Sequence, residues 1–172
     1  NNKKFYNEDF FINNKVLVPR FETEELIDFF IKLFNKEKSS NKRILDIGTG
    51  SGVISLILEK KIPSLDIYAI EKSKEAFEVA KINMKKKESK IKLTLEDIKN
   101  SKINNIDFVV SNPPYIKSDI IKKLSKEVKS EPIIALDGGE NGIEVSSLTF
   151  FIMLSSISIK IIEALFLFIS FS

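Results

Sequence analysis

The chain has 172 residues, a length that fits one domain with a single hydrophobic core. It contains no cysteine and no histidine, which excludes disulfides, thiolate nucleophiles, imidazole bases and the common zinc sites, so any chemistry must use carboxylates, amides, hydroxyls, backbone groups or a cofactor. Lysine and arginine number 27 against 24 aspartates and glutamates, and this small excess does not decide between solvated helix ends and a patch for an acidic partner.

The first part of the chain is predicted to be an extended arm followed by a helix. Residues 5–18 alternate apolar and polar side chains and lead to Pro19, so residues 1–22 are expected to form an N-terminal β arm or hairpin. From Thr23 onward apolar residues recur at helical spacing, and Thr23 suits the N-cap of that helix.

Residues 23–144 are predicted to form one α/β domain. Apolar runs indicate strands at 44–47, 65–70, 91–95 and 106–110, and helical patterns begin near Val53 and Ser73. Strands and helices that alternate in this way predict a Rossmann-like, mostly parallel sheet with helices on both faces.

Residues 145–172 form an atypical apolar C-terminal segment whose only charged residues are Lys160 and Glu163. Three interpretations stay open: a buried helix and strand of the same domain, a truncated or frame-shifted end, and a membrane segment, against which the two charges argue. We expect the fold to be incomplete at this end. Because residues 1–7 lack the pattern of a secretory signal, a cytoplasmic protein that does not bind a membrane is the expectation.

Four successive strand ends carry residues suited to ligand binding, and in an open parallel sheet such ends line one crevice. Gly48, Gly50 and Gly52 follow the first strand as G-x-G-x-G, which lets the backbone turn tightly and approach a ligand. The third glycine comes one residue earlier than in a dinucleotide pyrophosphate loop, so an adenosyl ligand suits the loop better than the cofactor of a nicotinamide dehydrogenase.

Acidic residues end the second and third strands. Glu71 could accept both hydrogen bonds from a ribose diol, and Asp97 could accept one from an adenine amino group, with Glu96 as its rival. After the fourth strand, Asn112-Pro113-Pro114-Tyr115 offers the Asn112 side-chain oxygen and the Pro113 carbonyl to one NH2 group, beside an aromatic ring. This element predicts a receptor for a planar nitrogen.

The motifs resemble those of class I methyltransferases, in which a segment such as residues 46–52 binds the methyl donor S-adenosylmethionine. Residues 112–115 look like the element of enzymes that methylate amide or exocyclic nitrogens. Residues 16–24 resemble the Pro-Arg-Pro-Glu-Thr-Glu signature of the HemK/PrmC glutamine methyltransferases, with Phe21 in place of the second proline, and residues 131–142 resemble their Glu-Pro to Gly-Gly segment.

This resemblance implies N5-methylation of a protein glutamine, that of the Gly-Gly-Gln loop of peptide chain release factors. The cofactor would be S-adenosyl-L-methionine, the product S-adenosyl-L-homocysteine, and no metal would be needed. It also implies three sets of site residues: for the cofactor Asp46, Gly48, Thr49, Gly50, Gly52, Glu71, Asp97 and Asn112; for catalysis Asn112, Pro113 and Tyr115; and for the substrate Asn112, Pro113, Pro114, Tyr115, Arg20 and Glu22.

Two alternatives stay open. The same NH2 receptor would suit an adenine or guanine amino group, so a methyltransferase of nucleic acid is one, although the modest charge and the residues 16–24 favour a protein substrate. The other is an adenosyl-binding module without catalytic activity.

Overall fold

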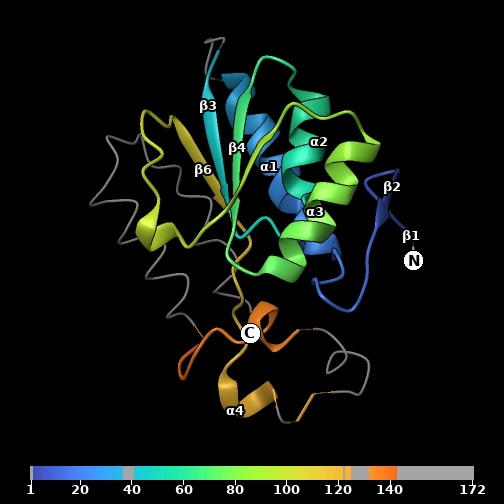
Figure 1. Cartoon of the computed structure of the whole chain (residues 1–172), viewed down its shortest axis with the longest axis vertical. Coiled ribbons are helices and arrows are strands. Elements are labelled where there is room, and N and C mark those ends of the chain that lie inside the picture. Colours follow the sequence, from blue (N-terminus) through green and yellow to red (C-terminus); the bar gives the residue numbers. More distant parts are fainter. Residues whose placement is uncertain (1, 37–40, 122, 125–131, 143–172) are drawn as a thin grey trace.

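The structure is a computed structural model that describes residues 2–36, 41–121, 123–124 and 132–142 (Figure 1). Four strands of the described residues, β3 (Arg43–Ile47), β4 (Asp66–Glu71), β5 (Lys92–Leu95) and β6 (Phe108–Ser111), pair in parallel in the order β5-β4-β3-β6. Their carboxyl ends therefore meet at one edge, which confirms the predicted Rossmann-like α/β class.

Helices follow the strands in alternation. The described ones are α1 (Phe21–Lys36), α2 (Val53–Lys61), α3 (Lys74–Lys86) and α4 (Ser118–Ile121), with short 3-10 turns η1 (Ile98–Asn100) and η3 (Ile133–Ala135). The side chain of Ser73 accepts a hydrogen bond from the Ala76 amide and so caps α3. The predicted cap at Thr23 is wrong, because α1 begins two residues earlier and Thr23 lies buried in its first turn.

The two faces of the sheet bury different side chains, as the strand period requires. Ile44, Ile67 and Phe108 join a core cluster with residues of α1, α2 and α3, and Figure 1 shows these helices on one side of the sheet. Leu45 and Ile70 point to the other face, where they form a second cluster with residues of the segment that carries η1.

The N-terminal arm packs on this helical layer. Strands β1 (Asn2–Phe5) and β2 (Glu8–Phe11) form an antiparallel hairpin, and Phe5 and Phe10 belong to the same core cluster as the helices. The Glu8 carboxylate forms ion pairs with Lys60 of α2 and with Lys87, the residue that follows α3, and these lower the pKa of Glu8 to about 2. The chain then runs from β2 toward α1 along the edge where the parallel strands end.

None of the helices in the described ranges combines the length and the apolar character needed to cross a membrane. The apolar segment 145–172 lies outside the described residues, so the interpretations of that segment stay predictions.

Candidate functional site

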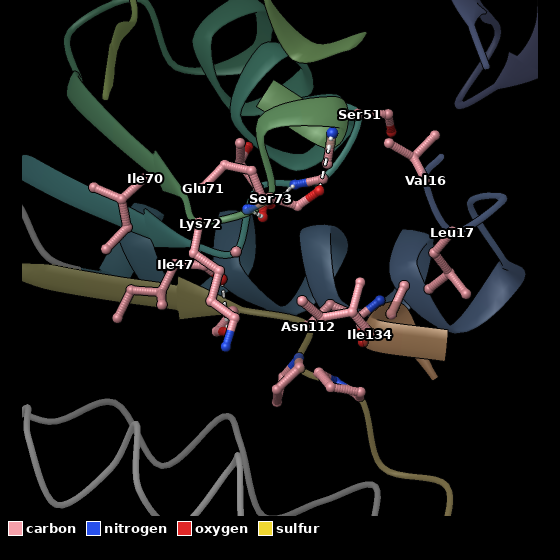
Figure 2. A pocket seen from close by; sticks show the side chains of 18 of the residues that line it. Val16, Leu17, Ile47, Ser51, Ile70, Glu71, Lys72, Ser73, Asn112 and Ile134 are labelled. Carbon is pink, nitrogen blue, oxygen red and sulfur yellow. Dashed lines mark hydrogen bonds between the residues drawn. The ribbon is translucent and has the colours of Figure 1, made fainter. Parts of the chain in front are cut away.

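A pocket of about 590 Å³ opens where β3, β4 and β6 end (Figure 2). This volume falls within the usual range for small-molecule and cofactor sites, roughly 300–1,000 Å³. Eight of the predicted site residues line the pocket: Gly48, Thr49, Gly50, Glu71, Asp97, Asn112, Pro113 and Pro114. Segments that are far apart in the sequence therefore meet around one cavity.

The glycine loop, residues 48–52, is fixed to the neighbouring strand by its backbone. The amides of Gly48 and Thr49 donate to the Ile70 carbonyl at 2.9 and 3.1 Å. A Cβ on Gly48 would meet no atom within 4 Å, whereas one on Gly52 would lie 3.4 Å from the Met84 side chain. Gly52 does not line the pocket, and its positive φ of 82° is the feature that favours glycine there.

Asp46 lies buried under the glycine loop and does not line the pocket. Its Oδ2 accepts hydrogen bonds from Thr49 Oγ1 at 2.7 Å and from Ser55 Oγ at 2.6 Å, while its Oδ1 is buried without a partner among the described residues. Burial raises the pKa of Asp46 to about 6, and the nearby negative charge of Glu71 adds to this rise. A cation or a hydrogen-bond donor beside Oδ1 would stabilise the ionised form.

Glu71 ends β4 with its carboxylate held by the backbone. Its Oε2 accepts from the Gly50 amide at 2.9 Å and its Oε1 from the Ser73 amide at 2.8 Å. A carboxylate has about four lone-pair positions, so each oxygen can accept one further hydrogen bond from a ligand. The fixed carboxylate is a ready acceptor for a pair of hydroxyl groups.

Asp97 and its rival Glu96 both line the pocket after β5. Asp97 Oδ1 accepts from the Lys99 amide at 3.0 Å, and Glu96 Oε1 accepts from Ser101 Oγ at 2.8 Å. Each carboxylate therefore keeps one oxygen for a ligand, and the geometry leaves both residues as candidates.

The NPPY loop, residues 112–115, forms another part of the wall. Asn112 Nδ2 donates to Thr23 Oγ1 at 3.2 Å, which leaves Asn112 Oδ1 to accept from a ligand. Tyr115 is 57% exposed and does not line the pocket. Figure 2 places Asn112 below Glu71 and Ser51 in the view, close to Ile134 of η3.

Residues 132–142 brace the NPPY loop through its backbone. The Ile116 amide donates to the Leu136 carbonyl, and the Gly138 amide donates back to the Ile116 carbonyl at 2.9 Å. A Cβ on Gly138 would lie 2.8 Å from Tyr115 Cα, and one on Gly142 would lie 2.7 Å from the Tyr115 carbonyl. Glycine is required at both positions for this close approach.

Residues 16–24 contribute to the pocket in a way that differs from the prediction. Arg20 and the exposed Glu22 do not line it, whereas Pro19 and Thr23 do. Sequence reasoning also missed Val16, Leu17, Lys15, Ile133 and Ile134 as lining residues. Their apolar or basic character is ordinary for an arm and a turn, so position in the fold, and not residue type, identifies them.

Comparison with known proteins identifies sequences that this chain resembles. The chain is 35% identical over 146 residues to a release factor glutamine methyltransferase of Koribacter versatilis and 42% identical over 147 residues to one of Dictyoglomus turgidum. Each alignment covers 83% of this chain and 51% of the relative, so the chain spans about half the length of these curated relatives. The names of these relatives confirm the resemblance that the motifs indicated.

Solved structures show the same fold at lower identity. The hMettl16 catalytic domain, solved with an RNA hairpin, superposes with a TM-score of 0.68 at 20% identity and covers 85% of this chain and 56% of its own. A methyltransferase from Pyrococcus furiosus gives 0.64 at 22% identity and covers 88% and 65%. A family model described as the methyltransferase small domain matches residues 25–131, and the chain belongs to that family.

Proposed function

We propose that the chain binds S-adenosyl-L-methionine and methylates the side-chain amide nitrogen of a glutamine in a peptide chain release factor. Release factors act in translation, so the proposed reaction is a cytoplasmic one. One observation carries the proposal: the glycine loop, Glu71 and the Asn112-Pro113 pair line a single pocket. The names of the curated relatives supply the substrate.

The described residues fit the proposed cofactor. S-adenosylmethionine is a cation with a ribose diol, and its pocket should offer carboxylates to both features. Glu71 has free lone pairs for the diol, and Asp46, which is buried beneath the glycine loop and does not line the pocket, would be stabilised in its ionised form by a positive charge nearby. Gly48 leaves open space where a side chain would otherwise stand, so the backbone can lie against the ligand.

When bound, S-adenosylmethionine would supply an electrophilic methyl group: the S–CH3 bond would break as the N–CH3 bond forms, and the amide nitrogen would release one of its two protons to solvent. The chain supplies orientation, because a glutamine amide nitrogen is a poor nucleophile whose lone pair is delocalised into its carbonyl. Asn112 Oδ1 and the Pro113 carbonyl would accept the two hydrogens of that NH2 group, raise its electron density and fix its direction. Orientation of this kind can recover ~7 to 11 kcal/mol of a barrier.

The remaining predicted residues have separate proposed roles. Tyr115, Arg20 and Glu22 do not line the pocket, so we propose that these residues contact the release factor around its glutamine. The product S-adenosyl-L-homocysteine has lost the sulfonium charge, and a pocket lined by the carboxylates of Glu71, Glu96 and Asp97 should release it more readily than it releases the substrate cofactor.

A second candidate substrate is the amino group of adenine or guanine in nucleic acid. Lys15, Lys72 and Lys99 line the pocket, and such residues would suit a phosphate backbone. The same Asn112-Pro113 receptor would hold the planar amino group of a base.

The test is a calorimetric titration of the whole chain with S-adenosylmethionine, followed by transfer of labelled methyl to an unmodified release factor. Label on the wild-type release factor, but not on one with the Gly-Gly-Gln glutamine replaced by alanine, is the expected result. Label on an unmodified RNA or DNA instead would favour the second candidate. Binding without transfer to either substrate would indicate a module without catalytic activity, and a folded chain that does not bind would contradict the proposal.

A further inference from the structure

Asn83 of α3 is a polar residue inside the core, only 1% exposed, and it belongs to none of the predicted site sets. Its Oδ1 accepts from the Phe11 amide at 2.7 Å, and its Nδ2 donates to the Phe11 carbonyl at 2.9 Å. The same Nδ2 donates its second hydrogen to the Ser51 carbonyl at 2.9 Å. Both hydrogens of the amide are thus used, and its three contacts reach two segments far apart in the sequence.

These two segments form different walls of the pocket. Ser51 belongs to the glycine loop, and Phe11 ends the β2 strand of the arm. Only a few residues beyond Phe11, the arm supplies Val16 and Leu17 to the pocket, and Figure 2 shows Val16 next to Ser51, with Leu17 below it in the view. The distance between the arm and the glycine loop therefore depends on the side chain that contacts both.

We propose that Asn83 is a positioning residue, whose one buried amide holds the arm against the glycine loop and thereby sets the shape of the pocket between them. It does not touch the pocket itself, so it acts through the Ser51 and Phe11 backbones. This inference rests on the proposed function only in taking S-adenosylmethionine as the ligand.

Replacing Asn83 with aspartate provides a test with a signature that general destabilisation would not give. A protonated carboxyl keeps one donor and one acceptor, so it can imitate most of the amide. An ionised carboxylate is an acceptor only and would face the Phe11 and Ser51 carbonyl oxygens. The Asn83→Asp variant should therefore lose function as the pH rises, relative to the wild-type chain at the same pH.

The matched control is Val79→Ala, which removes two methyl groups from a side chain of the same helix that is also buried in the core. It should lower stability without breaking either link. The Kd for S-adenosylmethionine is measured by calorimetry, and amide hydrogen exchange is followed in peptides that cover residues 8–17 and 48–56.

We expect the Kd of Asn83→Asp to exceed that of wild type by about tenfold at about pH 8 and by clearly less at about pH 5, since a lost buried hydrogen bond is worth roughly that factor. Exchange in both peptides should accelerate without ligand. Val79→Ala should do neither. If Asn83→Asp fails to fold, Asn83→Ser replaces it: its hydroxyl does not titrate and cannot make all three hydrogen bonds, so it should raise the Kd and accelerate exchange in both peptides equally at both pH values.

An equal loss of affinity in Val79→Ala, or a pH-independent loss in Asn83→Asp, would overturn the inference. If the wild-type chain itself does not bind S-adenosylmethionine, the proposed function fails, and the exchange data then decide the inference alone. In that case, unchanged exchange in the Asn83→Asp peptides would refute the link between the arm and the loop.

Discussion

Thr23 Oγ1 accepts a hydrogen bond from Asn112 Nδ2, so the first turn of α1 holds the side chain that begins the NPPY loop. Thr23 is 4% exposed, and its own amide donates to the Arg20 carbonyl. The contact joins residues 16–24 and residues 112–115, two motifs that the sequence linked only through their resemblance to glutamine methyltransferases. It also decides which end of the Asn112 amide is free.

Removing the Thr23 hydroxyl should therefore lower turnover more than cofactor binding. In Thr23→Val the Asn112 amide loses the partner that fixes its rotation, and we expect kcat to fall by about tenfold while the Kd for S-adenosylmethionine stays close to wild type. Methyl transfer under saturating cofactor measures the first quantity and calorimetry the second. Thr23→Ser keeps the hydroxyl and should retain most of the activity; equal loss in both variants would show that the methyl group matters instead.

The buried carboxyl of Asp46 predicts a pH dependence of stability. Its pKa of about 6 lies above the ordinary value of 3.8, so the native state binds more protons than the unfolded chain between these values. The contribution of Asp46 to the free energy of unfolding should fall by about 2–3 kcal/mol as the pH rises through this window, at ~1.4 kcal/mol per pKa unit.

Urea unfolding of the wild-type chain and of Asp46→Asn between about pH 4 and pH 7 measures this contribution. Plots of the free energy of unfolding against pH should have different slopes for the two proteins between pKa values of 3.8 and about 6. Across this window the asparagine variant should gain stability relative to the wild-type chain as the pH rises. At neutral pH the same variant should bind S-adenosylmethionine more weakly, because the negative charge is lost. Parallel slopes for the two proteins would contradict the assignment.

Much of the fold could be predicted because local patterns of apolar residues in the sequence indicate its strands and helices. The runs 44–47 and 65–70 are mostly apolar and are followed by Gly48 and Glu71, and the structure has β3 at Arg43–Ile47 and β4 at Asp66–Glu71, so the predicted bounds differ by at most one residue. The helix start at Thr23 could not be predicted correctly. The hydroxyl that looks like a cap in the sequence is used by Asn112, and this partner is brought near only by the tertiary fold.

Candidate site residues could be predicted where the residue type itself indicates a chemical role. They could not be predicted where the role depends on contacts that only the tertiary fold creates. The glycine loop, Glu71 and Asn112 are recognisable because few residue types can replace them. Asn83 in contrast looks like an ordinary polar residue on a helix with lysines around it, and only its burial against the arm and the loop reveals its contacts. Sequence spacing cannot show such a contact, because it joins residues from three elements.

The first and last glycines of the glycine loop should respond differently to alanine. Both have positive φ, 68° at Gly48 and 82° at Gly52, which costs an alanine about 1–2 kcal/mol. At Gly52 the new Cβ would lie 3.4 Å from the Met84 side chain and 3.6 Å from Ala80 Cα, which are ordinary van der Waals distances, so packing adds no clear cost. Chemical denaturation should therefore show similar losses of stability for the two variants, while Gly48→Ala, whose residue lines the pocket, should show the larger loss of cofactor affinity.

Glu71 should be required for cofactor affinity in its ionised form. In Glu71→Gln one of the two backbone amides of Gly50 and Ser73 would face an NH2 group in place of an acceptor, and the acceptor pair for the ribose diol would be broken. We expect the Kd for S-adenosylmethionine to rise by about tenfold or more. Glu75→Gln is the control, since Glu75 is exposed in the next helix and does not line the pocket. A wild-type Kd in Glu71→Gln would remove Glu71 from the cofactor site.

The brace behind the NPPY loop should be sensitive to a single methyl group. A Cβ at Gly138 would lie 2.4 Å from the Gly142 carbonyl oxygen and 2.8 Å from Tyr115 Cα, both backbone atoms that no side-chain rotation can move away. Gly138→Ala must therefore displace the loop that carries Asn112 and Pro113, and misplacement of an orienting group by about 1 Å can cost a hundredfold in rate. We expect kcat to fall by about tenfold or more, with a smaller change in the Kd for S-adenosylmethionine.

Glu140→Ala, an exposed change in the same turn, should leave both quantities near wild type. If Gly138→Ala retained full activity, the brace would not determine the geometry of the NPPY loop, and the catalytic role assigned to that loop would lose its structural support.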